Sequence, residues 1–206
     1  MTNPPDASRY ISFEGVEGAG KSTVASRLVA HLTSVGETAV RVREPGGTAV
    51  GEAVREIVLG DGHHPSPRAE AALFAAARAE LVAEIVRPAL EGGAWVVSDR
   101  SVYSSLAYQA GGRGLDLDEV RTLNDIAIGG LWPGRVVLLR LDHQEGLARQ
   151  SVGDRIGDEP DGFHRAVSTT FDALAEAESD RFTIVDAAKP LRQVVETVIG
   201  LLGLPS

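Results

Sequence analysis

The sequence predicts a three-layer α/β fold, in which a parallel sheet of about five strands is flanked by helices on both faces. Short apolar segments typical of buried strands alternate with longer segments that carry apolar residues at helical spacing. Such long connections favour parallel pairing with right-handed crossovers. The 206 residues show no internal repeat and no domain linker. We expect one domain over residues 10–206, preceded by a flexible tail at residues 1–9.

Hydrophobic periodicity and turn residues locate the individual elements. Strands are expected at residues 10–14, 38–42, 94–97, 136–141 and 182–185. Helices are expected at residues 22–35, 50–59, 68–90 and 116–128. Two further helices should end at residues 109 and 178, and two more should begin at residues 143 and 191. The glycines at 111–114 predict a helix break. Ligands bind at the carboxyl ends of parallel strands, so the residues after the first three strands should meet in one crevice.

Composition excludes several classes of protein. The chain has no cysteine, so disulfides, thiolate metal sites and cysteine nucleophiles are excluded. A net charge of -9 argues against broad affinity for nucleic acid or an anionic membrane, but it leaves room for a local basic pocket. No apolar run approaches the roughly 18 residues of a membrane span, and the N-terminus lacks a secretory apolar core. We expect a cytoplasmic protein.

The segment after the first strand carries the strongest motif. Residues 15–22 match the phosphate-binding loop pattern of a glycine, four residues, a glycine, a lysine and a serine, between an expected strand and an expected helix. Backbone amides of such a loop face a phosphate at the positive end of the helix. We expect Lys21 to bridge the outer phosphates and the Ser22 hydroxyl to bind Mg²⁺.

Charged residues follow the second and third strands. Asp99 could hold Mg²⁺ directly or through water, with the Arg100 guanidinium beside it. A surface ion pair or a helix cap would explain the same dipeptide. Arg43 precedes the rigid turn 44–48, which could hold its guanidinium toward the same crevice, although a solvated loop arginine would look the same.

Helical spacing brings further candidates together. Phe74 and Arg78 share one helix face and could recognise a base, and Ser105 shares a face with Gln109, beside Tyr108. A core phenylalanine, a surface arginine and a solvated polar face would give the same spacing.

The polar segment 151–162 could form a mobile flap that closes cations over phosphates. It contains Arg155, and Arg149 lies just upstream. An ordinary surface loop is the alternative. His63 and His64 are adjacent on a loop and have no further ligands at useful spacing, so we expect no metal there.

Several motifs follow one another in a fixed order along the chain. They are Phe13-Glu14-Gly15, the phosphate loop with Glu17, Arg43 to Thr48, Leu73 to Arg78, Asp99-Arg100, Ala107-Tyr108-Gln109, and Asp154-Arg155-Ile156 with Phe163-His164-Arg165. In this order they resemble the thymidylate kinase family, from about Tyr10 to the C-terminus. The last pair resembles the lid of the bacterial subtype, which has a carboxylate in the phosphate loop and a catalytic arginine in the lid.

The resemblance implies the P-loop NTPase fold of nucleoside monophosphate kinases. It also implies transfer of the γ-phosphoryl group of ATP to dTMP, which gives dTDP and ADP and requires Mg²⁺. The implied ATP-binding residues are Gly15, Val16, Glu17, Gly18, Ala19, Gly20, Lys21, Ser22 and Thr23.

The resemblance further implies roles for the acceptor-side residues. For the base, Phe74 would stack on thymine, and Arg78 and Ser105 would bind its edge. For the sugar, Tyr108 would lie beside the deoxyribose and Glu17 would meet the 3′-hydroxyl. Arg43 and Arg100 would bind the phosphate, and Gln109 would line the pocket. An acceptor phosphate is already a nucleophile, so catalysis needs charge neutralisation more than a base. We expect Lys21, Arg100 and Arg155, with Arg149 as a second lid cation, to stabilise the transition state, and Ser22 and Asp99 to hold Mg²⁺.

Alternatives stay open at this point. A kinase for dUMP or UMP would share every phosphate contact, and a non-catalytic nucleotide-binding switch would keep the phosphate loop alone. Ser101 stands where the family usually has an aromatic residue or histidine, and Arg140 also departs from the family pattern. The resemblance further implies a homodimer, with residues 68–90 and 116–128 as candidate contributors, and a cis Glu44–Pro45 bond.

Overall fold

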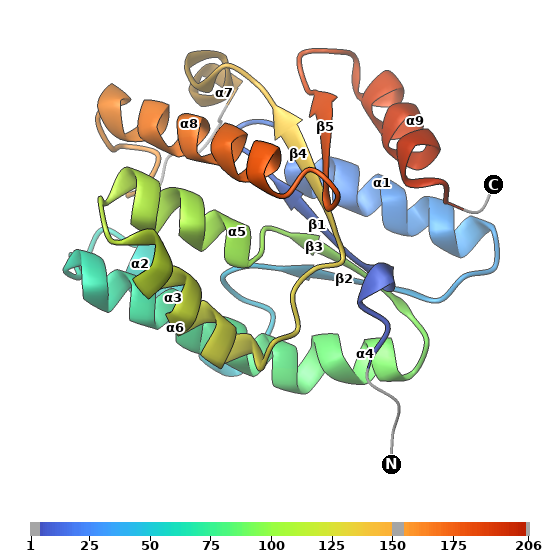
Figure 1. Cartoon of the computed structure of the whole chain (residues 1–206), viewed down its shortest axis with the longest axis horizontal. Coiled ribbons are helices and arrows are strands. Elements are labelled where there is room, and N and C mark those ends of the chain that lie inside the picture. Colours follow the sequence, from blue (N-terminus) through green and yellow to red (C-terminus); the bar gives the residue numbers. More distant parts are fainter. Residues whose placement is uncertain (1–4, 150–154, 205–206) are drawn as a thin grey trace.

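Figure 1 shows the computed structural model of the chain, which describes residues 5–149 and 155–204. Five parallel strands form one sheet in the order β2-β3-β1-β4-β5. The strands are β1 (Tyr10–Glu14), β2 (Ala39–Arg43), β3 (Trp95–Asp99), β4 (Arg135–Arg140) and β5 (Phe182–Asp186). The predicted α/β fold with a five-stranded parallel sheet is confirmed.

Helices cover both faces of this sheet (Figure 1). On one face, α1 (Lys21–Ser34) packs beside α9 (Leu191–Leu202). The other face carries α2 (Ala49–Leu59), α3 (Pro67–Leu81), α4 (Arg87–Glu91), α5 (Val102–Ser105), α6 (Leu117–Ile128) and α8 (Asp161–Ala177). The short helix α7 (His143–Arg149) follows β4.

Side chains of strand β4 alternate between the two hydrophobic cores, which lie on opposite faces of the sheet. Val136 and Leu138 pack with the helices of the α8 face, whereas Val137 and Leu139 pack with α1 and α9. All four side chains are buried because a parallel strand between two helical layers has no solvent-facing side. The continuous apolar run that predicted this strand therefore has a direct structural cause.

The helix predicted at residues 68–90 differs in its middle. α3 ends at Leu81, a π-helical turn spans Val82–Val86, and α4 begins at Arg87. Pro88 accounts for the wider turn, because proline has no N–H to donate and its ring clashes with the carbonyl four residues earlier.

The prediction of a helix break at residues 111–114 is wrong for its first two residues, because Gly111 and Gly112 are helical. The helix that begins as α5 continues through a second π-helical segment, Leu106–Gly112. A Cβ on Gly112 would lie 2.4 Å from the ring of Phe163 on α8, and one on Gly111 would lie 2.2 Å from the Thr170 hydroxyl. These glycines allow close packing between helices rather than ending one.

Two predicted boundary segments fall partly outside the described residues. Residues 1–4 of the expected tail lie outside them, while Ala7–Arg9 form a 3₁₀ turn whose Ala7 carbonyl accepts from the Gly134 amide at 3.1 Å. Residues 151–154 of the expected lid also lie outside, and α8 begins at Asp161, inside the predicted loop. Within the described ranges, no helix is both long and apolar enough to cross a membrane.

Two glycine-to-alanine substitutions test the packing role of Gly112. We expect Gly112→Ala to lower the free energy of unfolding by about 1–3 kcal/mol, because the methyl group would overlap the Phe163 ring. Gly200→Ala is the matched control: Gly200 lies in α9 with open space around its Cβ position, so alanine should raise stability by about 0.5–1 kcal/mol. Urea unfolding followed by circular dichroism measures both changes, and equal stability of the two variants would contradict the assignment.

Candidate active site

The phosphate-binding loop connects β1 to α1, as the sequence predicted. Gly15 has φ of 136° and Gly18 has φ of 68°, both in the region that favours glycine. Neither position has room for a side chain: a Cβ on Gly15 would lie 2.5 Å from the Leu139 carbonyl oxygen, and one on Gly18 would lie 1.9 Å from that of Gly146. The backbones of β4 and α7 therefore constrain the shape of the loop.

Lys21 is buried and folded back on this loop. Its Nζ donates to the carbonyl oxygens of Gly15 at 3.0 Å and Val16 at 2.7 Å. Burial, together with the nearby charge of Arg100, lowers the pKa of Lys21 to about 8. A bound phosphate would favour the charged ammonium, because opposite charges stabilise one another in a partly desolvated site.

Ser22 and Asp99 meet where α1 begins and β3 ends. The Ser22 hydroxyl donates to Oδ2 of Asp99. Mg²⁺ prefers hard oxygen ligands, and in phosphate-transfer sites it takes one or two from the protein and the rest from water and phosphates. This pair fits such an ion. The described part of the chain has no cluster of three or more histidine, aspartate or glutamate side chains that could hold a metal, and His63 and His64 belong to none.

Arg100, directly after β3, has φ of 72°, the only positive φ of a non-glycine residue in the described ranges. This conformation costs an L-residue about 1–2 kcal/mol, so its surroundings must maintain it. The Arg100 amide donates to the Phe13 carbonyl at 3.0 Å, and the Arg100 carbonyl accepts from the Ser98 hydroxyl at 2.5 Å. The turn directs the guanidinium to the phosphate loop, where its Nη1 donates to the Gly15 carbonyl at 3.4 Å.

The Arg100 guanidinium binds the carboxylate of the phosphate loop. Its Nη2 donates to Glu17 Oε1 at 2.8 Å, and the Tyr108 hydroxyl donates to the same oxygen at 2.7 Å. The guanidinium carbon also lies 4.9 Å from the centre of the Tyr108 ring. Burial opposes ionisation of Glu17, but the charges of Arg100 and Lys21 outweigh it and hold the pKa of Glu17 below its usual value.

The second carboxylate oxygen of Glu17 is buried and has no hydrogen-bond partner among residues 5–149 and 155–204. Its neighbour His164 places Nδ1 3.8 Å away, beyond hydrogen-bond distance. An acceptor in this state costs free energy unless a ligand or water supplies a donor.

A pocket of about 530 Å³ opens beside this cluster. Every predicted substrate-binding residue except Arg43 lines it, which brings together Glu17, Phe74, Arg78, Arg100, Ser105, Tyr108 and Gln109. The remaining lining residues are Glu44, Pro45, Arg55, Leu59, Ser104 and Ile156. An aromatic ring and several cations thus share one cavity, as nucleotide binding requires.

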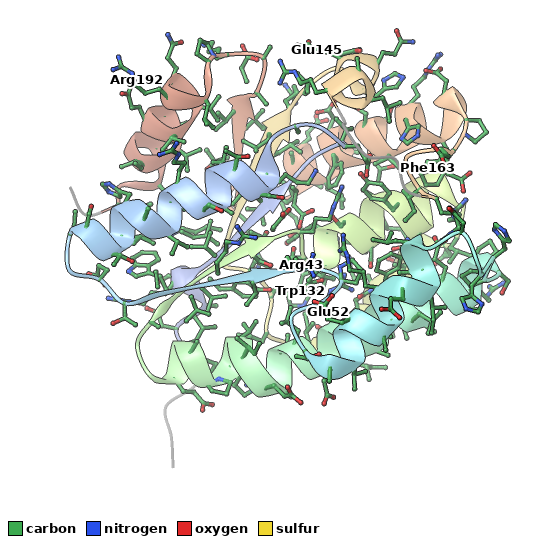
Figure 2. The ribbon with its side chains drawn as sticks, turned by 180° about the vertical axis from the view of Figure 1, so that it is seen from behind. Arg43, Glu52, Trp132, Glu145, Phe163 and Arg192 are labelled. Carbon is green, nitrogen blue, oxygen red and sulfur yellow. The ribbon has the colours of Figure 1, made fainter. Side chains whose placement is uncertain are left out.

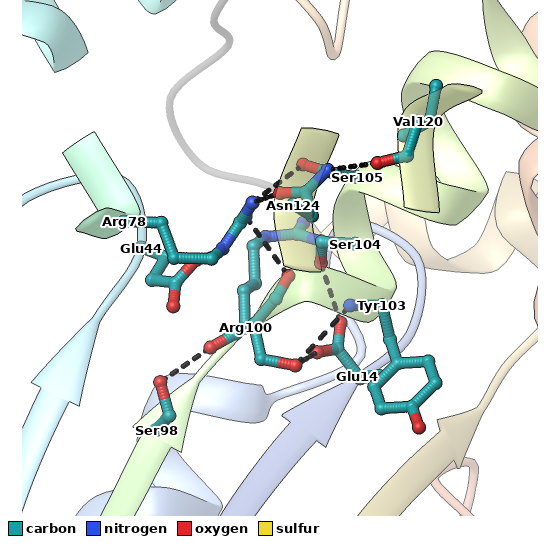
Figure 3. A network of polar contacts seen from close by, with 11 residues as sticks. Glu14, Glu44, Arg78, Ser98, Arg100, Tyr103, Ser104, Ser105, Val120 and Asn124 are labelled. Atoms are coloured by element: carbon teal, nitrogen blue, oxygen red, sulfur yellow. Dashed lines mark hydrogen bonds and ion pairs between the residues drawn. The ribbon is translucent and has the colours of Figure 1, made fainter. Parts of the chain in front are cut away.

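Arg78 is nearly enclosed by protein partners (Figure 3). Its Nε donates to Glu44 at 2.6 Å, its Nη1 to Ser105 at 3.1 Å and to Asn124, and its Nη2 to the Ser101 carbonyl at 3.2 Å. A guanidinium has five N–H donors. Counted over the described residues, one Nη2 hydrogen is therefore left to donate to a ligand. The Glu44–Pro45 bond before this site is cis.

Glu70 connects the pocket to the expected lid. This buried carboxylate accepts from Gln109 at 3.1 Å, from two nitrogens of Arg113, and from Arg155. Burial opposes its ionisation, but the bonds from Arg113 and Arg155 outweigh it and lower the pKa of Glu70. Arg155 also donates to the Val58 carbonyl, so its guanidinium is bound at α2 and α3 rather than directed at the phosphate loop.

Two further predicted cations are engaged outside the pocket. Nη2 of Arg43 donates to both carboxylate oxygens of Glu52 on α2, at 2.8 and 2.9 Å (Figure 2). Arg149 donates to the Ala187 carbonyl at 3.0 Å and to Glu145 at 2.6 Å. Neither guanidinium lines the pocket in this structure.

Two residues in or beside the pocket, Arg55 and Asn124, were not predicted from the sequence. Arg55 donates to the Pro45 carbonyl at 3.0 Å and lines the pocket, but in the sequence it resembles any charged residue on an amphipathic helix. Asn124 is fully buried against Arg78, with its amide donating to the Val120 carbonyl at 2.8 Å. A buried asparagine in α6 has no local signal, because its partner lies on α3.

Comparison with known proteins agrees with this geometry. The family model described as thymidylate kinase matches residues 13–198. A thymidylate kinase of Bifidobacterium longum is 46% identical over 190 residues, which cover 90% of this chain and 92% of that protein. A thymidylate kinase of Deinococcus radiodurans is 47% identical over 184 residues, which cover 88% of this chain and 89% of that protein.

The fold gives the same result. The crystal structure of thymidylate kinase from Ehrlichia chaffeensis matches with a TM-score of 0.80 and 28% identity, covering 94% of this chain and 97% of that one. The family match extends from β1 into α9, so it includes the phosphate loop and every residue that lines the pocket. The chain therefore belongs to the thymidylate kinase family.

Proposed function

We propose that the protein transfers the γ-phosphoryl group of ATP to dTMP in a Mg²⁺-dependent reaction, which gives dTDP and ADP for dTTP synthesis. The position of Arg100 carries this proposal. Its guanidinium binds Glu17 of the phosphate loop and also lines the pocket that contains Phe74. It therefore stands between the expected sites of the donor and acceptor phosphates.

On the donor side, the loop amides and Lys21 hold the phosphates of ATP. Lys21 would exchange its bonds to two backbone carbonyls for bonds to phosphate oxygens. Ser22 and Asp99 would hold Mg²⁺, which supplies positive charge to the β- and γ-phosphates when bound.

On the acceptor side, a phosphate oxygen of dTMP attacks the γ-phosphorus while the bond to the ADP oxygen breaks. No protein base is needed, because this oxygen is already ionised at neutral pH. Arg100 neutralises charge on the acceptor phosphate. Arg43 contributes once it leaves Glu52, and the lid cations Arg149 and Arg155 contribute once they leave the partners they bind here.

The base and sugar contacts follow from the donor and acceptor atoms of the pocket that have no protein partner in the described part of the chain. Phe74 stacks on thymine, and the remaining Nη2 hydrogen of Arg78 donates to a base carbonyl, with Ser105 beside it. The unpartnered oxygen of Glu17 accepts from the 3′-hydroxyl of the sugar, beside Tyr108. Gln109, held by Glu70, completes the wall.

The same geometry ranks the alternatives. Cytosine carries an amino group at C4 where thymine has a carbonyl, so a cytosine base cannot accept from Arg78 at that position. dUMP and UMP keep that carbonyl and are the nearest competitors. A non-catalytic nucleotide switch would not require Arg78 and Arg100 in an acceptor pocket, so this function is not favoured.

We also propose a cytoplasmic homodimer. Ile126 on α6 is 76% exposed, and Leu117 on the same helix is 40% exposed, which makes this helix a candidate for subunit contact. Sedimentation equilibrium at micromolar concentration should give twice the chain mass of 21.7 kDa. A monomer would refute the dimer while leaving the proposed reaction unaffected.

Parallel assays of ADP release test the proposed reaction. We expect Mg-ATP to give the highest kcat/KM with dTMP, lower values with dUMP and UMP, and the lowest with dCMP, because only the last lacks the C4 carbonyl. Lys21→Ala serves as the blank and should lose at least about 10³-fold in kcat. A preference for another acceptor would contradict the proposed contacts to the thymine base. Full activity of Lys21→Ala would show that Lys21 has no role in phosphoryl transfer.

Alanine substitutions at two arginines test the lid cations. We expect Arg155→Ala to lower kcat about 10²-fold, because a transition-state contact is lost. Arg165→Ala is the matched control, since this arginine is exposed on α8 and forms its ion pair with Asp161 of the same helix. If Arg155→Ala instead keeps kcat but lowers the unfolding temperature, Arg155 serves to fasten the loop to Glu70.

A further inference from the structure

Glu14 is a buried carboxylate that the reaction described above does not use. It is the last residue of β1, directly precedes the phosphate loop and is 0% exposed. Its Oε1 accepts from the Ser101 hydroxyl at 2.6 Å, and its Oε2 accepts from the Ser104 hydroxyl at 2.6 Å (Figure 3). Both serines follow Arg100 in the chain: Ser101 precedes α5 and Ser104 lies within it.

Ser104 links this carboxylate to Arg100. Nη1 of Arg100 donates to the Ser104 hydroxyl oxygen at 3.2 Å. A serine hydroxyl has one hydrogen and two acceptor lone pairs. Because that hydrogen is committed to Glu14, the oxygen presents its lone pairs to the guanidinium. The direction of the Ser104 hydroxyl therefore depends on Glu14.

Ser101 links the same carboxylate to the backbone of the turn. Arg100 has the left-handed conformation, and Ser101 is the residue after it. The Ser101 hydroxyl is fully buried against Glu14, while its carbonyl accepts from Arg78 at 3.2 Å. Ser101 stands where the resemblance implies an aromatic residue or histidine, and its hydroxyl donates to Glu14.

The electrostatic environment supports a fixed role for this group. Burial raises the pKa of Glu14 to about 7, and the bonds from Ser101 and Ser104 and the charge of Arg100 oppose that rise. A buried carboxyl group destabilises the fold relative to an apolar side chain unless its bonds offset the cost. Glu14 has such bonds from Ser101 and Ser104, which hold its carboxylate in one position beside the phosphate loop.

We propose that Glu14 is a positioning residue for phosphoryl transfer: it orients the Arg100 guanidinium through Ser104 and anchors the turn that presents Arg100 through Ser101. This inference rests on the proposed function, in which Arg100 holds the acceptor phosphate. A displacement of about 1 Å in such a contact can cost about 10²-fold in rate.

A double-mutant cycle between Glu14 and Arg100 is the test. Glu14→Gln should lower kcat/KM for dTMP about 10²-fold in the wild-type background and less than about 3-fold in the Arg100→Ala background, because the effect passes through Arg100. KM for Mg-ATP should change by less than about 2-fold, since the donor side is not altered. Equal losses in both backgrounds would overturn the proposal.

Two further variants keep the result interpretable. Ser12→Ala removes, from the same strand, a buried hydroxyl that has no hydrogen-bond partner in the described part of the chain. This variant should leave both kinetic constants within about 2-fold of wild type. If Glu14→Gln does not fold, Ser104→Ala breaks the same connection without altering the buried carboxylate, and the cycle is repeated with it. A Ser104→Ala effect that adds fully to that of Arg100→Ala would also overturn the proposal.

Failure of this inference is distinguishable from failure of the proposed function. If the wild-type protein does not phosphorylate dTMP, or if Arg100→Ala keeps full activity, the proposed function or the role of Arg100 fails. If wild type is active, Arg100→Ala is not, and Glu14→Gln matches wild type, only the positioning role of Glu14 is lost.

Discussion

The pairing of Arg100 with Glu17 joins the two halves of the site. A charge removed from water is destabilising unless it is paired and hydrogen-bonded, and this pair is mostly buried. Glu17 belongs to the phosphate loop and Arg100 to the turn after β3, so the pair fixes one segment against the other. Tyr108 closes the arrangement by binding both partners. This contact therefore joins the phosphate loop to the pocket that Arg100 lines.

The same principle extends around the pocket, where several arginines pair with a carboxylate from another element. The pairs are Arg100 with Glu17, Arg78 with Glu44, Arg43 with Glu52, and Arg113 and Arg155 with Glu70. Charges fixed before substrate arrives need little reorganisation during the reaction, which is the basis of electrostatic catalysis. The more exposed pair, Arg43 with Glu52, and the Arg155 contact at the lid are those that a phosphate could most easily replace.

The sequence was sufficient for the sheet, the phosphate loop and most of the pocket, because these depend on local patterns. Residues 15–22 require glycines at defined positions, and buried parallel strands require continuous apolar runs. It was insufficient where the cause lies in another element. Gly112 looked like a break because the Phe163 ring that fills its Cβ position is distant in sequence. Asn124 and Glu70 had no local signal for the same reason. The state of Arg155, bound to Glu70, depends on long-range packing as well.

The most direct test of this account is a crystal structure of the protein with dTMP and Mg-ADP. The account predicts that the Arg100 guanidinium contacts the dTMP phosphate while it keeps its bond to Glu17, with thymine stacked on Phe74 and the backbone of residues 99–104 unchanged. A dTMP phosphate bound elsewhere, with Arg100 turned out of the pocket, would contradict the claim that this ion pair prepares the acceptor site.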